Sequence, residues 1–232
     1  MANLRKHILA LALGCLSLGN FADAWADDKD FATDVNVEVE KDITKKWGIG
    51  VGGELRMNNN STSVDKLAAS VGSDYELTKW LKIGAGYEFI NDWNGPEKDF
   101  FTRRHRWNVS ASYKHKFTKR INAGLKLKYQ QTFRSEAYKT YSQPRKDYVR
   151  AKIDGEYKIK GMPLYTHLSA EMFYFCNSND GNTIDDIRYN AGVTYKINKH
   201  NSVDLSFQID DEMNVSNPED RFMLCASYKY KF

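Results

Sequence analysis

The chain has 232 residues, of which 28% are charged, and its 34 basic and 30 acidic side chains give a formal charge of +4. So small an excess of positive charge does not indicate a nucleic-acid partner. No apolar run beyond the N-terminal segment approaches the roughly 20 residues that a membrane-spanning helix requires. Any membrane crossing would therefore have to be made by strands.

Residues 1–26 have the pattern of a cleaved secretory signal peptide. A basic start at residues 5–7 is followed by an apolar segment at 8–18 and by Ala-Trp-Ala at 24–26, which has small residues at the two positions that specify cleavage. The mature protein is expected to begin at Asp27 and to form a single domain, residues 27–232.

Apolar and polar residues then alternate, as in strands that have one apolar face. In the first such segment, Val35, Val37 and Val39 alternate with polar residues. Most of these segments have about 11 to 15 residues, enough for a tilted strand to cross a membrane. Eleven can be counted: Thr33–Ile43, Trp47–Met57, Lys66–Leu77, Trp80–Ile90, Arg103–Phe117, Arg120–Arg134, Lys146–Ile159, Leu164–Cys176, Asp186–Ile197, Ser202–Glu212 and Asp220–Phe232.

The connections between these segments fall into two alternating classes. Short ones, such as Thr78-Lys79 and Thr118-Lys119, alternate with longer polar ones, such as Asn91–Thr102 and Ser135–Arg145. Short turns at one end and longer loops at the other are typical of outer-membrane barrels. A soluble barrel has no reason to sort its loops in this way.

The last segment alternates up to the final residue and places Tyr228, Tyr230 and Phe232 on one face. The sequence therefore predicts an all-β fold, an antiparallel up-and-down transmembrane β-barrel. Because bacterial single-chain barrels usually have an even number of strands, we expect about twelve. The twelfth would be a short strand in residues 27–33, unless that leader threads the lumen.

Several segments resemble an uncharacterised family of bacterial outer-membrane barrels, the domain of unknown function 2490. They are VEVEKDITKKW at 37–47, TKWLKIGAGYEFIND at 78–92, RRHRWNV at 103–109, LKLKYQQTFRSE at 125–136 and the terminal YKYKF. The resemblance implies a barrel fold and the outer membrane of a Gram-negative bacterium as the location. It implies no activity, cofactor or site residue.

If the apolar face of each strand points outward, alternation assigns the other face to the lumen. The acidic residues predicted to line it come from the first four strands: Glu38, Glu40, Glu54, Asp74, Glu76 and Glu88. The basic residues come from the fifth to seventh strands: Arg104, Arg106, Lys114, Lys116, Lys126, Lys128, Arg134, Arg150 and Lys152. This pattern predicts an acidic wall beside a basic wall.

Two interpretations of these walls remain open. The charges could form an ion-pair network that fills a narrow lumen, because buried charges persist only when they are paired. They could instead line a wet pore whose aligned side chains select a polar or anionic solute. Lys229 and Lys231 of the last strand would compete with the basic wall for the acidic residues.

An enzyme is not expected. His167, Ser169 and Glu171 share one face of a strand, but alternate residues are about 7 Å apart, which is too extended for a catalytic relay. His105 has Trp107 and Val109 rather than a serine on its face. No metal-ligand or cofactor motif occurs, and Cys176 and Cys225 lie on opposite faces of non-adjacent strands, so we expect no disulfide between them.

The expected function is that of a narrow porin or solute channel for small polar or anionic compounds. A non-conducting structural or surface-interaction barrel is the alternative, and an outer-membrane hydrolase is a more remote one. The expected partners are outer-membrane lipid and lipopolysaccharide, and the barrel-assembly machinery through the strand that ends at Phe232. No nucleic acid is expected.

Overall fold

The computed structural model describes residues 31–93, 101–134, 145–178, 181–214, 218 and 220–232. The predicted signal peptide at 1–26 lies outside these residues, as do 94–100 and 135–144 of two predicted loops. The strands are β1 (Phe31–Asp42), β2 (Trp47–Asn58), β3 (Ser63–Glu76), β4 (Leu81–Trp93), β5 (Phe101–Lys116), β6 (Ile121–Arg134), β7 (Arg145–Lys158), β8 (Leu164–Phe175), β9 (Thr183–Lys196), β10 (Asn201–Glu212) and β11 (Arg221–Lys231).

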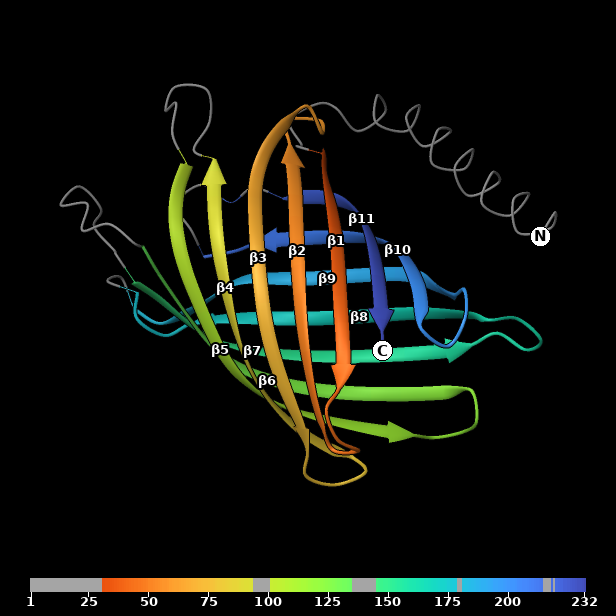
Figure 1. Ribbon diagram of the computed structural model, residues 1–232. Helices are drawn as coiled ribbons and strands as arrows, with labels where there is room; N and C mark the ends of the chain where they lie inside the picture. Colours follow the sequence, from red (N-terminus) through yellow and green to blue (C-terminus); the bar gives the residue numbers. More distant parts are fainter. Residues whose placement is uncertain (1–30, 94–100, 135–144, 179–180, 215–217, 219) are drawn as a thin grey trace.

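The strands form one closed barrel in which each strand pairs with its neighbours in sequence. In Figure 1, strands β1–β4 at the front run almost at right angles to β8–β10 behind them, as expected for strands that tilt strongly around a barrel. Short turns gather at the lower right of this view. We call that end the short-turn end and the opposite end the long-loop end. No helix in the described part of the chain is long and apolar enough to span a membrane.

The barrel closes differently from the expected even-stranded arrangement. Eleven strands close it across the described residues, because β1 pairs with β11 in parallel, with Glu38 opposite Lys229 and Val39 opposite Tyr230. Up-and-down order with an odd number of strands requires one parallel pair, since the first and last strands run in the same direction. Residues 31–33 do not form part of a separate strand but begin β1.

Four of the five short turns share one hydrogen-bond pattern. Thr44 Oγ1 accepts the backbone N–H groups two and three residues further on, at 3.2 and 3.0 Å. Thr78 and Thr118 repeat this arrangement, and Asn198 does so through its side-chain carbonyl. Such side-chain contacts satisfy backbone donors within a tight turn. They explain why the short connections repeatedly begin with Thr or Asn.

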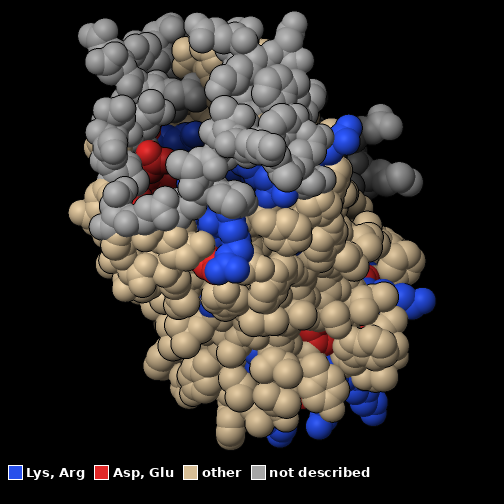
Figure 2. Space-filling view, turned by 90° about the vertical axis from the view of Figure 1, so that its left-hand side faces the viewer, with Lys and Arg blue, Asp and Glu red and all other residues tan. Residues whose placement is uncertain are grey.

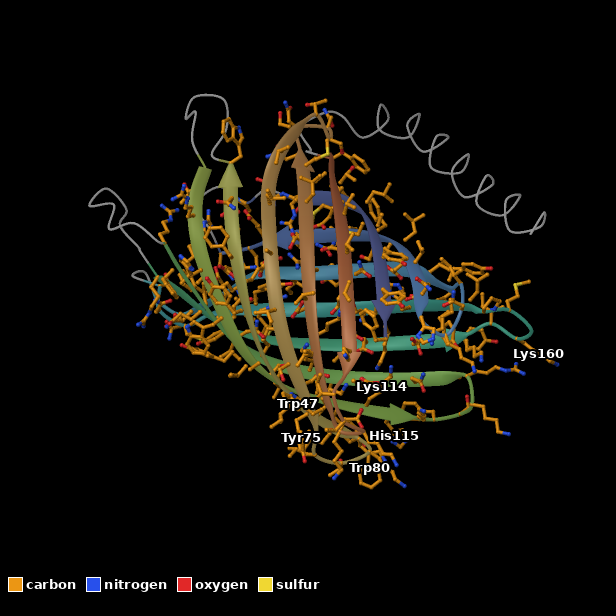
Figure 3. The ribbon with its side chains drawn as sticks, in the orientation of Figure 1. Trp47, Tyr75, Trp80, Lys114, His115 and Lys160 are labelled. Carbon is orange, nitrogen blue, oxygen red and sulfur yellow. The ribbon has the colours of Figure 1, made fainter. Side chains whose placement is uncertain are left out.

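The outer face of the barrel is apolar and exposed. Figure 2 shows a broad face of uncharged residues, with Lys, Arg, Asp and Glu gathered mainly near its margins. Trp47, Tyr75 and Trp80 lie together at the short-turn end (Figure 3), and Trp80 is 59% exposed. The indole N–H of Trp47 donates to Ser73 Oγ at 2.7 Å. Aromatic residues with one polar group are typical of a membrane interface.

The inner face combines charged residues with glycine. A Cβ atom at Gly52 would lie 2.8 Å from Ser70 Oγ, and one at Gly124 would lie 2.6 Å from Asp154 Oδ1. These glycines therefore make room for polar side chains of the neighbouring strands. The small set of buried apolar residues includes Ile90 and Met223, so the interior contains mainly polar groups and is not a conventional apolar core.

Candidate functional site in the barrel lumen

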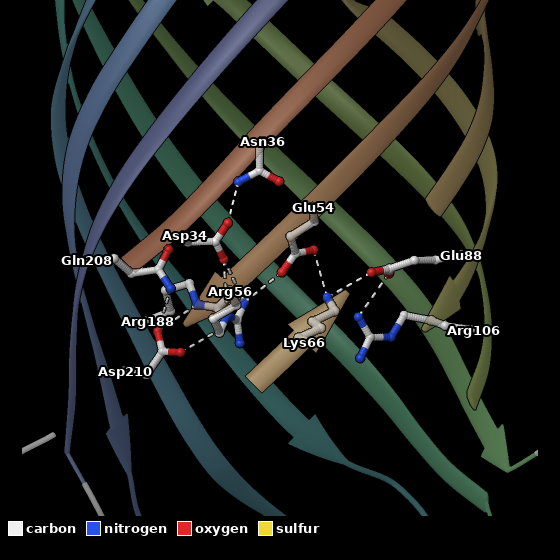
Figure 4. Close-up of polar contacts among 10 residues, drawn as sticks. All are labelled: Asp34, Asn36, Glu54, Arg56, Lys66, Glu88, Arg106, Arg188, Gln208 and Asp210. Atoms are coloured by element: carbon white, nitrogen blue, oxygen red, sulfur yellow. Dashed lines mark hydrogen bonds and ion pairs between the residues drawn. The ribbon is translucent and has the colours of Figure 1, made fainter. Parts of the chain in front are cut away.

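Ion pairs link consecutive strands on the inner face near the long-loop end (Figure 4). Arg56 Nη2 on β2 lies 3.0 Å from Asp34 Oδ2 on β1 and 3.0 Å from Glu54 Oε1 on its own strand. Glu54 Oε2 also accepts a hydrogen bond from Lys66 Nζ on β3 at 2.7 Å. Because the side chain of Lys66 is only 8% exposed, its buried ammonium group is stabilised by the carboxylate of Glu54 rather than by water.

The same row of charges continues onto β4 and β5. Lys66 Nζ lies 2.8 Å from Glu88 Oε1, so one ammonium bridges two carboxylates on different strands. Glu88 Oε2 accepts a hydrogen bond from Arg106 Nη1 at 3.0 Å. Arg106 Nε donates to Thr132 on β6 at 3.1 Å. Ion pairs and hydrogen bonds therefore form one continuous row from β1 to β6.

A second group of ion pairs covers β7 to β10. Arg150 Nε and Nη2 donate to the two oxygens of Glu171 at 3.0 and 2.7 Å, and Arg150 Nη1 donates to Gln130 at 2.7 Å. Arg188 Nε and Nη2 donate to the two oxygens of Asp210 at 2.7 and 2.8 Å. Both pairs have the two-pronged geometry that suits arginine and a carboxylate.

An aromatic ring lies between these two arginine–carboxylate pairs. The guanidinium carbons of Arg150 and Arg188 lie 4.1 and 5.1 Å from the centre of the Phe173 ring. This is a favourable cation–π arrangement. We call all of these ion-paired residues the collar: Asp34, Glu54, Arg56, Lys66, Glu88, Arg106, Arg150, Glu171, Arg188 and Asp210.

Cavities lie on both sides of the collar. One of about 550 Å³ opens toward the long-loop end and is lined by residues such as Arg104 and Arg221. Two others, of about 620 and 410 Å³, lie toward the short-turn end. Glu54 and Glu88 line both the 550 Å³ and the 620 Å³ cavities. The collar thus forms the boundary between two compartments of the lumen.

The acidic residues nearest the short-turn end are neutralised by neighbouring lysines. Lys229 Nζ on β11 lies 2.9 Å from both Glu38 and Glu40 on β1, which confirms the predicted competition from the last strand. Lys82 in turn lies 3.2 Å from Asp74 and 3.8 Å from Glu76. These four carboxylates of the predicted acidic wall are therefore paired with Lys82 and Lys229 rather than with the basic wall.

The lysines of the predicted basic wall have no such partner among the described residues, and three of them lie on the paired strands β6 and β7. Lys126 and Lys128 on β6 and Lys152 on β7 form no ion pair or hydrogen bond with any described residue. Lys126 lies opposite Lys152 in the register of β6 and β7, and Lys128 lies opposite Arg150. Lys126 and Lys128 line the 410 Å³ cavity. We call these three residues the lysine cluster.

The other basic residues predicted from the sequence differ from this cluster. Arg104 is paired with Asp92, at 2.5 Å, just as Arg106 and Arg150 are paired within the collar. These three arginines are therefore held in ion pairs, as the network interpretation of the basic wall predicts. Lys114 and Lys116 are exposed at the short-turn end of β5, and Arg134 lies opposite Arg104 in the register.

The histidines also have defined partners. His167 Nε2 lies 2.7 Å from Asp204 Oδ2, although β8 and β10 are separated by β9. Glu171 binds Arg150, so His167, Ser169 and Glu171 do not act as one group. His105 contacts the hydroxyl of Tyr87 on the outer face.

Cys176 and Cys225 are both free thiols. Within the described ranges, no group of three or more His, Cys, Asp or Glu side chains is arranged to hold a metal ion.

Sequence reasoning missed some of the lumen charges that matter most. Arg188, Asp204 and Asp210 occupy inward positions of the ninth and tenth strands, and each of them forms an ion pair. The same alternation of apolar and polar residues that predicted the other inward residues would have placed these residues on the inner face as well. Their partners could not be read from the sequence, because most pairs join different strands.

Three solved structures share this fold. A bacterial polysaccharide outer-membrane secretin aligns with a TM-score of 0.54 and 11% identity over 78% of this chain, which spans 63% of that protein's length. The NanC porin aligns with a TM-score of 0.53 and 14% identity, covering 88% of this chain and 99% of that one. The COG4313 outer-membrane channel from Pseudomonas putida F1 aligns with a TM-score of 0.51 and 14% identity, covering 78% and 76%.

At these identities the likeness concerns the fold, a closed barrel of the kind found in porins. No curated protein matches the sequence significantly. The family model described as a protein of unknown function, DUF2490, matches residues 35–221, and this confirms the resemblance seen in the sequence. The chain therefore belongs to the DUF2490 family.

Proposed function

We propose that this protein is an outer-membrane barrel that conducts small polar solutes and prefers anions, including acidic or phosphorylated compounds. The observation that carries the proposal is the lysine cluster, three lumen-facing cations without an ion-pair partner among the described residues. The other charges of the lumen are largely held in pairs, so this cluster is the part of the wall best able to act on a passing ion.

The proposed location rests on the two faces of the barrel. Apolar side chains are exposed around the outer face, and aromatic residues gather at its short-turn end. Such a surface is stable in lipid and would be an aggregation hazard in water. Outer-membrane lipid and lipopolysaccharide are therefore the proposed surroundings, with the strand ending at Phe232 as the proposed signal to the barrel-assembly machinery.

Anion preference follows from the spacing of the cluster. Lys126 and Lys152 lie opposite each other on paired strands, which are about 4.8 Å apart. Like charges at directly opposite positions of paired strands repel each other, and the repulsion is stronger in a narrow lumen than in bulk water. An anion that passes between them lowers this electrostatic energy, whereas a cation raises it. We assign no catalytic step to these residues.

The collar favours a second candidate function, that of a non-conducting barrel. Its ion pairs separate the long-loop cavity from the cavities below. If they do not open, the lumen is closed, and the lysine cluster contributes only to the charge of a sealed interior.

Planar-bilayer recordings of the refolded barrel distinguish the two. We expect the triple substitution K126Q/K128Q/K152Q to shift the reversal potential in a KCl gradient away from the anion side. The matched control is K45Q/K79Q/K119Q, which removes three lysines from short turns, and it should leave the reversal potential nearly unchanged. A conducting wild-type barrel whose selectivity is the same in the triple variant would contradict the proposal, and a silent barrel would favour the structural alternative.

A further inference from the structure

The 550 Å³ cavity on the long-loop side of the collar has an unusual lining. Seven of its lining residues are basic and four are acidic. Six of the seven are arginines: Arg56, Arg104, Arg106, Arg150, Arg188 and Arg221. Arginine carries a rigid fork of N–H donors that matches the oxygens of a carboxylate or phosphate.

Three of the carboxylates that pair with these arginines do not line the cavity. Asp34, Glu171 and Asp210 bind Arg56, Arg150 and Arg188 but are absent from the cavity wall. Because these three carboxylates are absent from the lining, the surface that a solute meets is more positive than the whole set of charges.

Several guanidinium donors also remain available. Arg56 Nη1, Arg106 Nη2 and Arg188 Nη1 donate no hydrogen bond to any residue in the described part of the chain. Arg221, at the start of β11, forms no ion pair with a described residue. The cavity therefore has both positive charge and unused N–H groups.

The arginines are held in place by contacts on their other sides. Arg188 is fixed by two hydrogen bonds to Asp210, and its guanidinium lies over the Phe173 ring. Arg106 is fixed by Glu88 and Thr132. Donors that are already oriented lose little conformational entropy when they bind a ligand.

We propose that this cavity is an oxyanion-binding vestibule, which captures solutes bearing a carboxylate or phosphate group before they reach the collar. The inference rests on the proposed function for its biological role, but it makes a separate statement: the vestibule binds an anion whether or not the lumen conducts. Its volume suits a small metabolite rather than a polymer segment of many units.

Binding of inorganic phosphate to the refolded protein in detergent tests the vestibule directly. Titration calorimetry at constant ionic strength should show saturable binding to the wild-type protein. Arg221→Gln removes a guanidinium that has no structural ion pair to lose, and we expect it to weaken phosphate binding about tenfold. Arg120→Gln, the same change in a short turn, should leave binding unchanged. Acetate added together with phosphate should lower the apparent affinity for phosphate, because the site recognises oxyanions in general.

The possible results separate this inference from the proposed channel. Weaker phosphate binding in Arg221→Gln supports the vestibule even if the barrel is silent in bilayers. Equal binding in Arg221→Gln and wild type overturns it, as does the absence of saturable binding to the wild type. If K126Q/K128Q/K152Q loses phosphate binding while Arg221→Gln keeps it, the anion binds at the lysine cluster and the vestibule is refuted. Heat-modifiable migration in gels confirms that each variant is folded.

Discussion

Glu171 lies directly opposite Lys152 in the register of β7 and β8, yet its carboxylate binds Arg150 instead. Both carboxylate oxygens are occupied, at 3.0 and 2.7 Å from the guanidinium. Arginine can donate two parallel hydrogen bonds to a carboxylate, whereas lysine acts as a point charge. Glu171 therefore neutralises Arg150 of the collar rather than its register partner, and Lys152 has no ion-pair partner in the described chain.

The Arg150–Glu171 pair should contribute strongly to folding. Its side chains are 11% and 9% exposed, so Glu171→Gln leaves a buried guanidinium without its counter-ion, and the free energy of unfolding should fall by roughly 3 kcal/mol. Urea unfolding of the refolded barrel, followed by tryptophan fluorescence, measures the loss. The control Glu76→Gln breaks a half-exposed contact with Lys82 and should cost less than about 1 kcal/mol. Equal losses in the two variants would show that the collar pair is not specially stabilising.

Lys66 should control the boundary between the two compartments. Its ammonium lies 2.7 Å from Glu54 and 2.8 Å from Glu88, and Lys66→Met leaves two carboxylates that repel each other. We expect a higher single-channel conductance and a weaker anion preference in planar bilayers. Lys82→Met makes the same change at a more exposed pair and serves as the control. Conductance that stays the same or falls in Lys66→Met would mean that Lys66 does not restrict the lumen.

The parallel seam between β1 and β11 can be tested with a native cysteine. Asp34 is the register partner of Cys225, and paired strands lie about 4.8 Å apart, within the range that a disulfide can bridge. The variant Asp34→Cys should therefore form an intramolecular disulfide with Cys225 on mild oxidation, detected by mass spectrometry of the folded protein.

Asn36→Cys is the control for the seam, because its register partner is Ser227 rather than a cysteine. It should form the bond much less readily. If Asp34→Cys cross-links no better than Asn36→Cys, β1 and β11 do not pair as described, and the eleven-stranded closure is wrong.

The fold was largely predictable because period-two alternation is a local property. Val35, Val37 and Val39 mark the outer face of β1 without reference to any other strand. The ends of strands were less predictable: β3 begins at Ser63 rather than Lys66, in a region where the register with β2 shifts between Arg56 and Met57. The strand number also differed from the expected twelve. Whether a barrel closes with an odd or an even number of strands depends on how its first and last strands pair, and the local sequence pattern does not specify that pairing.

The inward residues were predictable in kind, but their pairing was not. Alternation placed Glu54 and Arg106 on the inner face, but it could not show that Lys66 and Glu88 join them into one row. The contact between His167 and Asp204 is a clearer case, because it spans β9 above Gly192. A Cβ atom there would lie 2.8 Å from the imidazole. Such contacts depend on the curvature of the closed barrel.

The reversal potential of the wild-type barrel in a KCl gradient tests the central claim most directly. The three lysines of the cluster face the lumen without an ion-pair partner in the described chain, so chloride should carry more current than potassium. We predict a reversal potential on the chloride side of zero. A potential on the potassium side, or a folded barrel that never conducts, would contradict the account.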